Sequence, residues 1–237
     1  MLDADINPQI RIVRLTDPQM AETMSEAVLA WCLYLHRKMP DYKILQNAKQ
    51  WKQLTLAQPK DCHISVFGLG KLGTRAALRL QQNGFTVRGW SQSEKSIENI
   101  ETYSGPSGFE SILALTNIAV ILLPLTNNTH NLFNQAVLQA LPSGASIINF
   151  ARGPIVNEKD LLVALNDHHI DHAVLDVFST EPLPVNSDLW SHTQVTVLPH
   201  ISAPTTISTA AELAAHNLDQ FIERGVIPDS VDRNKGY

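Results

Sequence analysis

Short apolar runs alternate with helical stripes along most of the chain. Runs typical of β-strands cover residues 64–68, 86–90, 118–123, 146–150, 172–177 and 194–198. Segments with helical spacing cover residues 72–83, 134–141, 158–166 and 206–224. Strands that alternate with helices in this way predict an α/β fold, in which helices cover both faces of a mostly parallel sheet.

One run indicates how deeply this sheet is buried. Residues 118–123 read Ile-Ala-Val-Ile-Leu-Leu, without a polar side chain. Successive side chains of a strand point to opposite faces, so apolar side chains lie on both faces here. This is typical of a strand in a parallel sheet whose two sides are both covered.

A long helix is predicted over residues 17–39, before the first strand. Asp17 can cap the free N–H groups of its first turn, and Pro18 suits the first helical position. Leu29 and Leu33 lie off the main apolar stripe, so the middle of the helix is apolar nearly all round. We interpret it either as a helix that crosses between domains or contacts a second subunit, or as an ordinary core helix.

Composition narrows the class of protein. The chain has 237 residues, of which 44% are apolar and 17% charged, and its net charge of −5 gives no basic face for nucleic acid. Its longest apolar run, residues 27–35, is too short to cross a bilayer. Cys32 and Cys62 lack metal-type spacing, so neither a disulfide framework nor a metal site is predicted. With no secretory signal pattern, the sequence predicts a cytoplasmic protein.

A glycine-rich turn follows the first predicted strand. Residues 68–73 read Gly-Leu-Gly-Lys-Leu-Gly, a G-x-G-x-x-G pattern between a strand and a helix. The first glycine allows a tight turn, the second lets the backbone approach a pyrophosphate, and the third lets helix and strand pack closely. The pattern predicts a Rossmann-like, doubly wound sheet that binds a dinucleotide, the alternative being a glycine turn without a ligand. The predicted contacts are Gly68, Gly70, Lys71, Leu72 and Gly73.

The end of the second strand bears on the choice of cofactor. An acidic residue at this place accepts hydrogen bonds from the ribose hydroxyls of NAD. Here hydroxyls and a lysine follow the strand instead, and they can accept the extra phosphate of NADP. We therefore predict NADP in preference to NAD, although the charge of Glu94 counts against it. The predicted contacts are Trp90, Ser91, Ser93 and Lys95, of which the last three are solvated loop residues in the alternative interpretation.

Three polar residues each follow an apolar run. Arg152, Glu181 and His200 come after the fourth, fifth and sixth predicted strands. Because ligands of open parallel sheets bind at the carboxyl ends of the strands, we expect these residues to converge on the crevice that the glycine-rich turn faces.

The chemistry of these residues suits the reduction of a 2-oxo acid. An arginine fork binds a carboxylate and the adjacent carbonyl oxygen. A histidine can give a proton to that oxygen as hydride arrives from a nicotinamide, and a glutamate can hold the other N–H of the imidazole. Each residue also has a simpler interpretation as part of a solvated turn or loop.

Several segments resemble the D-isomer-specific 2-hydroxyacid dehydrogenases, and among them the glyoxylate/hydroxypyruvate reductases. The most specific are INFARGPIVNEKDLLVAL, LDVFSTEPLP and LPHISAPT, over residues 148–165, 175–184 and 198–205. The resemblance implies that Arg152 binds the substrate, that His200 is the acid/base and that Glu181 is its partner. It also implies a homodimer with the long helix at the contact. The further cofactor contacts that it implies are Leu123, Pro124, Thr129, Ala151 and Asp176.

The sequence departs from that family in two respects. Gln92 stands where NADP-preferring relatives commonly carry an arginine, which leaves NAD open as the cofactor. Family members also carry an N-terminal substrate domain, most of which we expect to be absent from this chain. The predicted parts are a remnant of the substrate domain over residues 1–16, the dinucleotide-binding domain with the long helix over 17–204, and a C-terminal helix and tail over 205–237 that returns to the substrate domain.

The resulting hypothesis is a reductase that transfers a hydride from NADPH to glyoxylate or hydroxypyruvate. One alternative is a dehydrogenase of the same family for another 2-hydroxy acid, such as phosphoglycerate. A second is a truncated or inactive relative that binds a nucleotide as a scaffold. The joint presence of Arg152, Glu181 and His200 favours an enzyme. The predicted partners are a small 2-oxo acid and a second copy of the chain, with neither nucleic acid nor a membrane.

Overall fold

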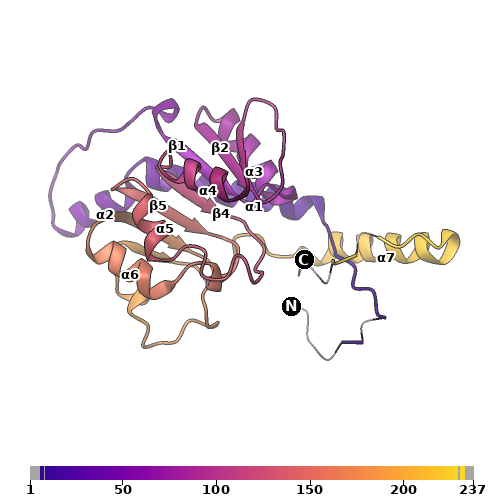
Figure 1. The fold of residues 1–237 in the computed structure, drawn as a ribbon. Coiled ribbons are helices and arrows are strands. Elements are labelled where there is room, and N and C mark those ends of the chain that lie inside the picture. Colours follow the sequence, from indigo (N-terminus) through magenta and orange to yellow (C-terminus); the bar gives the residue numbers. More distant parts are fainter. Residues whose placement is uncertain (1–5, 8, 229, 233–237) are drawn as a thin grey trace.

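A parallel sheet organises the chain. The computed structural model describes residues 6–7, 9–228 and 230–232 (Figure 1). Within them, seven strands lie in the order β3-β2-β1-β4-β5-β6-β7, and all neighbours are parallel. The predicted α/β class and the Rossmann-like, doubly wound sheet are confirmed. The outer ends of the two predicted end segments, residues 1–5 and 233–237, lie outside the described residues.

The six predicted strands are present, and their ends agree with the prediction within two residues. A further strand lies at the edge of the sheet. The bounds are β1 His63–Phe67, β2 Thr86–Ser91, β3 Glu101–Ser104, β4 Ile118–Ile121, β5 Ala145–Asn149, β6 Ile170–Leu175 and β7 Val195–Val197.

The helices alternate with these strands. In the described part of the chain, none is long and apolar enough to cross a bilayer. Their bounds are α1 Pro18–His36, α2 Met39–Asn47, α3 Lys71–Gln82, α4 Gly105–Leu113, α5 Gln135–Ala140, α6 Glu158–Asn166 and α7 Ile207–Arg224. Short 3₁₀ turns cover Pro59–Asp61, Gly153–Ile155 and Asp188–Trp190.

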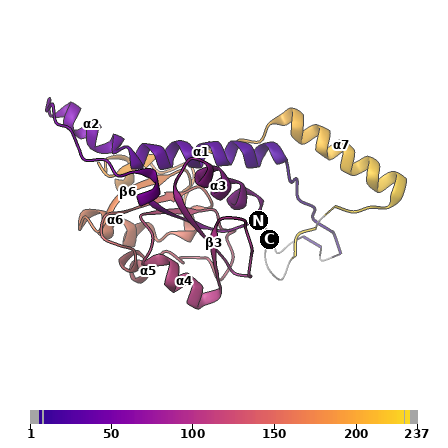
Figure 2. The same cartoon turned by 90° about the horizontal axis from the view of Figure 1, so that it is seen from above.

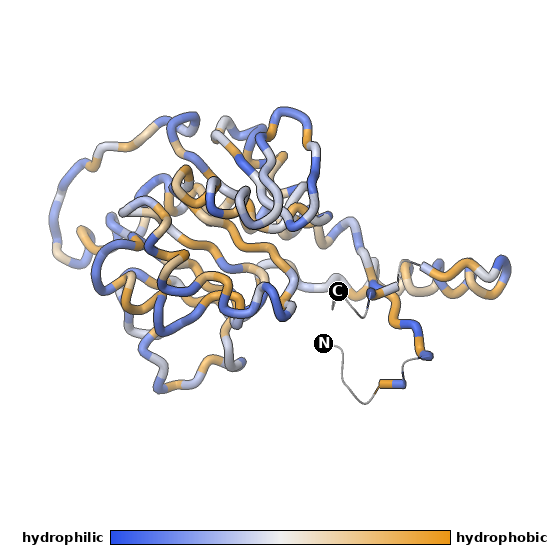
Figure 3. Tube along the Cα trace, viewed as in Figure 1, coloured by the Kyte–Doolittle hydropathy of each residue, from blue (hydrophilic) through white to orange (hydrophobic). Residues whose placement is uncertain are grey.

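Two groups of buried apolar side chains pack on opposite faces of the sheet. On β5, Ile147 belongs to one group and its neighbour Ile148 to the other, as the alternation of strand side chains requires. Helices α4, α5 and α6 contribute to the first group, and α1 and α3 to the second. Figure 3 shows the hydrophobic residues concentrated along the central strands. The sheet is therefore covered on both sides.

The chain order reverses between β1 and β4. From β1 the chain proceeds outward through β2 to β3, and it then returns to build β4, β5, β6 and β7 on the other side of β1. The connections therefore leave the sheet in opposite directions on the two sides of this point. Open α/β sheets bind ligands at this kind of reversal.

The helix predicted over residues 17–39 ends earlier than expected. α1 stops at His36, and Lys38 adopts a left-handed conformation with φ of 54° before α2 begins. Pro40 explains the break, because its ring would clash with the carbonyl of the preceding turn if the helix continued through it. It is tolerated at the start of α2, which extends beyond the body of the molecule (Figure 2).

α1 packs on α3 through one side. Met24, Val28 and Cys32 are buried there. Of the two residues off the main apolar stripe, Leu29 is partly buried against the same core, whereas Leu33 is 39% exposed. The burial on more than one side that the sequence predicts is thus present only in part.

A polar network also joins α1 to α3. Two guanidinium nitrogens of Arg75 donate to the two carboxylate oxygens of Glu22 at 2.6 and 2.8 Å. Arg79 donates to the hydroxyl of the buried Ser25 at 2.9 Å. The paired geometry fixes how α1 lies along α3, the helix that follows the glycine-rich turn.

β3 and α4 are not predicted by the sequence patterns above. β3 has four residues at the edge of the sheet, none of them buried, so its apolar signal is weak. α4 begins with Gly105 and Pro106, a pair more typical of a turn. Tertiary packing forms the helix nevertheless, because it buries Phe109 against the aromatic rings of Phe67 and Trp90.

α7 extends away from the sheet (Figures 1 and 2) and has no buried residue. The Thr209 hydroxyl donates to Asp17, whose carboxylate also caps α1. Ile207, Leu218 and Ile222 on α7 are 84%, 59% and 78% exposed. The division into a substrate-domain remnant, a dinucleotide-binding domain and a returning helix remains a prediction.

His172 is a buried titratable group in β6. It is 3% exposed, and its Nε2 lies 2.9 Å from the hydroxyl of Thr196. Burial, assisted by the charge of His192, lowers the pKa of His172 from 6.5 to about 4. The neutral ring is therefore the form that the fold accommodates.

We expect the free energy of unfolding to decrease as the pH falls from 6.5 towards 4. The unfolded chain binds a proton on His172 in this range and the folded chain does not. The stability that neutral His172 contributes is therefore complete above pH 6.5 and is lost as the pH falls below that value. Between pH 7 and pH 5 the loss amounts to roughly 2 kcal/mol. Urea unfolding at the two pH values measures it, and His172→Gln should reduce the difference.

The exposed His216 on α7 provides the control. His216→Gln should retain the full pH dependence of the wild-type protein. An equal pH dependence in His172→Gln and the wild type would contradict the assignment.

Candidate active site

The glycine-rich turn joins β1 to α3 as the sequence predicts. Gly68 has φ of 109°, and a Cβ on it would lie 2.7 Å from the carbonyl oxygen of Leu122. A Cβ on Gly73 would overlap the carbonyl oxygen of Gly68. Both positions therefore require glycine, the first for its backbone conformation and both for close packing.

Gly70 differs from these two glycines. It is exposed, and no heavy atom lies within 4 Å of the position that its Cβ would take. It precedes α3, and no side chain caps the N–H groups of the first turn, which starts with Lys71 and Leu72. Uncapped N–H groups and the positive end of a helix dipole attract an anion. The open space beside them fits the diphosphate of a dinucleotide.

The residues after β2 form a tight turn. The hydroxyl of Ser91 donates to the carbonyl of Ser93 at 2.6 Å, while Ser93 and Lys95 are exposed. Trp90 is 5% exposed, and its indole N–H donates to the carbonyl of Gly105 at the start of α4. The Trp90 side chain is thus part of the core, and its contact with a cofactor remains a prediction.

The turn after β4 is closed by Thr129. Its hydroxyl donates to the Pro124 carbonyl at 2.6 Å and accepts from the Thr126 N–H at 2.8 Å. Leu123 is 7% exposed and contributes to the core. Thr129 therefore shapes this turn beside the crevice, and the backbone of the turn meets Gly68.

Arg152 lies on the loop after β5, and the side chain of Asn149 hydrogen-bonds to the backbone of this loop. Asn149 is 1% exposed; its side-chain oxygen Oδ1 accepts from the Ala151 N–H at 3.2 Å, and its side-chain Nδ2 donates to the Arg152 carbonyl at 3.1 Å. One guanidinium nitrogen of Arg152 donates to the Ala151 carbonyl at 2.7 Å. The side chain is half-buried, so the loop presents part of its fork at the sheet edge.

The loops after β5 and β6 are in close contact. A Cβ on Gly153 would overlap the backbone of Phe178 and lie 2.4 Å from the nitrogen of Ser179. Glu158, the first residue of α6, accepts from the Ser179 N–H at 2.6 Å. The loop that leads to Glu181 is thus fixed against the loop of Arg152.

Glu181 and His200 form a hydrogen-bonded pair. Nδ1 of His200 lies 2.8 Å from Oε2 of Glu181, and Oε1 accepts from the Phe178 N–H at 2.9 Å. The side chain of His200 is 51% exposed and that of Glu181 is 35% exposed. The predicted pair is therefore present, with one side open to solvent.

The electrostatics of this pair keep Glu181 ionised. Burial raises the pKa of its carboxyl, but hydrogen bonds from His200 and from the Phe178 N–H outweigh burial, together with the charges of His200 and Arg152. The net effect lowers the pKa of Glu181 below 4.5. An ionised carboxylate only accepts hydrogen bonds, so Nδ1 of His200 carries the proton and Nε2 is left for a ligand.

Asp176 holds the loop of His200. It is 2% exposed, and its two carboxylate oxygens accept from the N–H groups of Ile201 and Ser202 at 2.7 and 2.9 Å. His200 has φ of 54°, a left-handed conformation that costs a non-glycine residue about 1–3 kcal/mol. The resemblance implies Asp176 as a cofactor contact, and this remains a prediction; the partners of its carboxylate in the described residues are backbone groups of this loop.

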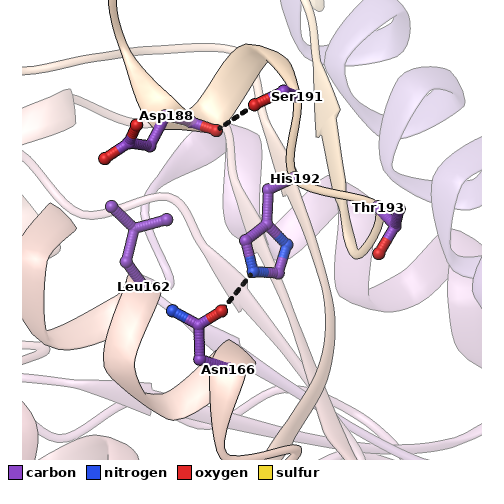
Figure 4. Close-up of a pocket in the computed structure, with 6 residues that line it drawn as sticks. All are labelled: Leu162, Asn166, Asp188, Ser191, His192 and Thr193. Carbon is purple, nitrogen blue, oxygen red and sulfur yellow. Dashed lines mark hydrogen bonds between the residues drawn. The ribbon is translucent and has the colours of Figure 1, made fainter.

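Two recesses lie at opposite ends of the strands. One of about 410 Å³ is lined by Leu125, Thr126, Asn127 and His130, in the turn beside the crevice. The other, of about 440 Å³, lies where the strands begin, between α6 and the segment before β7 (Figure 4). There His192 contacts the amide oxygen of Asn166 at 3.3 Å, far from the carboxyl ends of the strands.

The sequence analysis missed three residues that build the site: Asn149, Gly153 and Glu158. Asn149 had a recognisable signal, because it is the one polar residue in an otherwise apolar strand end. Gly153 and Glu158 had none, since their partners at residues 178–179 follow only after another helix and strand.

A family model described as the NAD binding domain of D-isomer specific 2-hydroxyacid dehydrogenase matches residues 29–202, which is most of the chain. Solved structures of proteins with this description are also similar to the whole chain. One from Xanthobacter autotrophicus Py2, in complex with NADPH and MES, has 39% sequence identity and a TM-score of 0.95, and the match covers 98% of this chain and 96% of that one.

Two further structures are similar over a smaller share of their own length. An NADPH-dependent glyoxylate/hydroxypyruvate reductase from Sinorhizobium meliloti, with NADP and sulfate, has 34% identity and a TM-score of 0.91 over 97% of this chain and 74% of that one. A probable 2-hydroxyacid dehydrogenase from Rhizobium etli CFN 42, with NADP, has 32% identity and a TM-score of 0.92 over 98% and 75%.

The contact between the loops after β5 and β6 predicts that Gly153→Ala lowers the stability of the folded protein. The added methyl overlaps backbone that cannot rotate away, so we expect a destabilisation of about 1–3 kcal/mol and a lower Tm. Gly70→Ala is the matched control, because its methyl enters open space and should leave Tm nearly unchanged. Differential scanning calorimetry compares the two, and equal Tm values would contradict the contact.

Proposed function

Because the chain belongs to the D-isomer specific 2-hydroxyacid dehydrogenase family, we propose that it reduces glyoxylate or hydroxypyruvate to the 2-hydroxy acid with NADPH. Members of this family are NAD(P)-dependent oxidoreductases. The observation that carries the proposal is the 2.8 Å contact between Nδ1 of His200 and the carboxylate of Glu181. The charge of Arg152 also lowers the pKa of Glu181. A proton donor, its partner and a carboxylate-binding group thus lie on neighbouring loops.

The glycine-rich turn and α3 fit a dinucleotide. The N–H groups at Gly70, Lys71 and Leu72 are available to the diphosphate, and Gly68 and Gly73 allow the turn that exposes them. When bound, the nicotinamide supplies the hydride that adds to the carbonyl carbon of the substrate. Ser91, Ser93 and Lys95 would hold the 2′-phosphate, and the backbone at Leu123, Pro124 and Ala151 would line the nicotinamide end.

Arg152 would bind and orient the substrate. Its guanidinium can donate to the carboxylate of a 2-oxo acid and to the neighbouring carbonyl oxygen, because its N–H groups form a planar fork. Both contacts polarise the carbonyl carbon for attack. The hydrogen bond to the Ala151 carbonyl leaves other N–H groups of the fork for the substrate.

His200 would donate the proton. As the hydride adds to the carbonyl carbon, the carbonyl oxygen gains negative charge, and Nε2–H of the imidazolium can transfer its proton to that oxygen. Glu181 holds Nδ1–H and stabilises the positive charge before transfer. One hydride and one proton thus convert the 2-oxo acid to the 2-hydroxy acid, and in the reverse direction neutral His200 would act as the base.

The substrate and cofactor assignments draw on similar proteins. The Sinorhizobium meliloti structure is described as an NADPH-dependent glyoxylate/hydroxypyruvate reductase, and the Xanthobacter and Rhizobium structures hold NADPH or NADP. Positions 90 and 91 at the end of β2 carry Trp and Ser and no acidic residue, which independently favours NADP over NAD. NAD remains the alternative cofactor because Gln92 offers no positive charge.

Assembly, location and domain division belong to the same proposal. We infer a homodimer with α1 at the contact, because Leu33 leaves apolar surface on its outer side. We also infer a cytoplasmic protein, in which the dinucleotide-binding part spans residues 17–204 between a substrate-domain remnant and the returning segment 205–237.

Substitution of His200 or Arg152 tests the proposed roles. His200→Ala should reduce kcat about a hundredfold or more, because the proton donor is lost. Arg152→Lys keeps the charge but loses the fork, so it should raise KM for glyoxylate as well as lower kcat. The absorbance of NADPH measures the rates.

His216→Ala on the exposed face of α7 is the control and should match the wild type. A wild-type protein without activity above background on either 2-oxo acid, or a His200→Ala variant with the wild-type rate, would contradict the proposed function.

A second prediction concerns the cofactor. Lys95→Ala should weaken the binding of NADPH about tenfold and leave that of NADH nearly unchanged, because only NADPH carries the 2′-phosphate. Glu94→Gln is the matched control, and it should strengthen NADPH binding by removing a negative charge nearby. Fluorescence titration gives the Kd values. Equal losses for the two cofactors in Lys95→Ala would contradict a phosphate contact.

A further inference from the structure

The segment between β2 and β3 carries the residues proposed to hold the 2′-phosphate. Local contacts fix its two ends. The Ser91 hydroxyl donates to the Ser93 carbonyl at 2.6 Å, and the Ile100 N–H donates to the Ile97 carbonyl at 3.2 Å. Residues 94–96 between these contacts have no regular secondary structure, so a partner from outside the segment is needed to fix their backbone.

Thr102 in β3 supplies that partner. Its hydroxyl donates to the carbonyl of Lys95 at 2.6 Å, which fixes the backbone from which the Lys95 side chain extends. Lys95 is exposed, and in the part of the chain that the structure describes its ammonium forms no ion pair. The backbone of Lys95 is thus held, while its charge is available to an anion.

The register of β3 places Thr102 on the face of the sheet that carries the glycine-rich turn. Thr102 pairs with Gly89 of β2, and directly opposed residues of two strands point to the same face. A Cβ on Gly89 would lie 2.6 Å from the side chain of Leu69, which belongs to the glycine-rich turn. Lys95 is therefore held on the same face as the turn that fits the diphosphate.

A second polar group fixes β3 to β2 from the opposite face. Nε of Arg88 donates to Oε2 of Glu101 at 3.0 Å, and the hydroxyl of Tyr103 donates to Oε1 at 2.7 Å. Arg88 and Glu101 are also direct partners in the ladder. Because strand side chains alternate between faces, Glu101 and Tyr103 lie on one face and Thr102 on the other. The edge strand that carries Thr102 is thus anchored independently of the segment that Thr102 holds.

We propose that Thr102 is a positioning residue, whose hydrogen bond to the Lys95 carbonyl directs the Lys95 ammonium to the 2′-phosphate of NADPH. This inference rests on the proposed preference for NADPH, and Thr102 acts through Lys95 rather than on the cofactor itself. Lys95 is the one cation in residues 91–100. A phosphate attracts an ammonium far more strongly than a ribose hydroxyl does, so the position of this charge affects the binding of NADPH and not that of NADH.

Titration with the two cofactors tests the role of the hydroxyl. Thr102→Val keeps the shape of the side chain but removes the donor, so the Kd for NADPH should rise about fivefold while the Kd for NADH stays within about twofold. Thr102→Ser keeps the donor and should bind both cofactors as the wild type does. The proposal is overturned by an unchanged Kd for NADPH in Thr102→Val, by equal losses for the two cofactors, or by an equal loss in Thr102→Ser.

Thr86 provides a matched control. Its hydroxyl donates to the carbonyl of Lys60 at 2.6 Å, which is the same kind of contact. It is the first residue of β2 and lies at the opposite end of the strand from Ser91. Thr86→Val should therefore leave both Kd values within about twofold of the wild type. A fivefold loss of NADPH binding in Thr86→Val would reveal a general effect of such substitutions and overturn the assignment to Thr102.

A double-mutant cycle tests whether Thr102 acts through Lys95. In the Lys95→Ala background, Thr102→Val should change the Kd for NADPH by less than about twofold, because the ammonium that Thr102 positions is gone. A fivefold loss in that background would overturn the proposal. If Thr102→Val does not fold, Thr102→Ala removes the same hydroxyl and takes its place in the cycle.

These measurements follow binding and need no turnover. A protein that gives the expected Kd values but reduces no 2-oxo acid would refute the proposed reaction and leave the role of Thr102 intact. A preference for NADPH that Thr102→Val does not reduce would refute this inference alone. A wild-type protein that binds NADH as tightly as NADPH would refute the cofactor proposal and the inference together.

Discussion

Polar side chains that accept from or donate to loop backbone hold the candidate active site of this protein together. The loops after β5, β6 and β7 leave a sheet that is apolar on both faces, so their backbone N–H and carbonyl groups need partners close to the core. Asn149 hydrogen-bonds to the backbone of the Arg152 loop, and Glu181 accepts from the Phe178 N–H. Asp176 accepts from two backbone N–H groups of the His200 loop. Asn149 is the last residue of β5 and Asp176 directly follows β6, so these two partners connect the loops directly to the sheet.

Close backbone contact provides the second constraint. Gly68 meets the turn after β4, and Gly153 meets the backbone after β6, so neighbouring loops cannot move independently. This matters for a reaction in which a proton and a hydride reach adjacent atoms, because effective catalysis needs the groups held in near-contact geometry. The glycines of this chain thus serve the site in two ways, since Gly70 leaves space for a ligand while Gly73 and Gly153 remove space between loops.

The charges follow the same arrangement. Glu181 stays ionised because His200 and the Phe178 N–H donate to it, although burial acts in the opposite direction. Its ionisation defines the protonated nitrogen of His200, and hence which nitrogen faces the crevice. Within β6, His172 is held neutral by burial and has no part in this chemistry.

The sequence by itself determined the parallel sheet, the glycine-rich turn and the three residues Arg152, Glu181 and His200, because apolar runs and motif spacing are local properties of the chain. It did not reveal β3, α4 or the break at Lys38, where weak edge burial or a single proline decides the outcome. Only the tertiary structure decided that Trp90 faces the core, that Gly153 touches Phe178, and that Asp176 binds the His200 loop rather than open space. These contacts join segments from different strands, and hydrogen-bond partners that are distant in sequence leave no periodic signal in it.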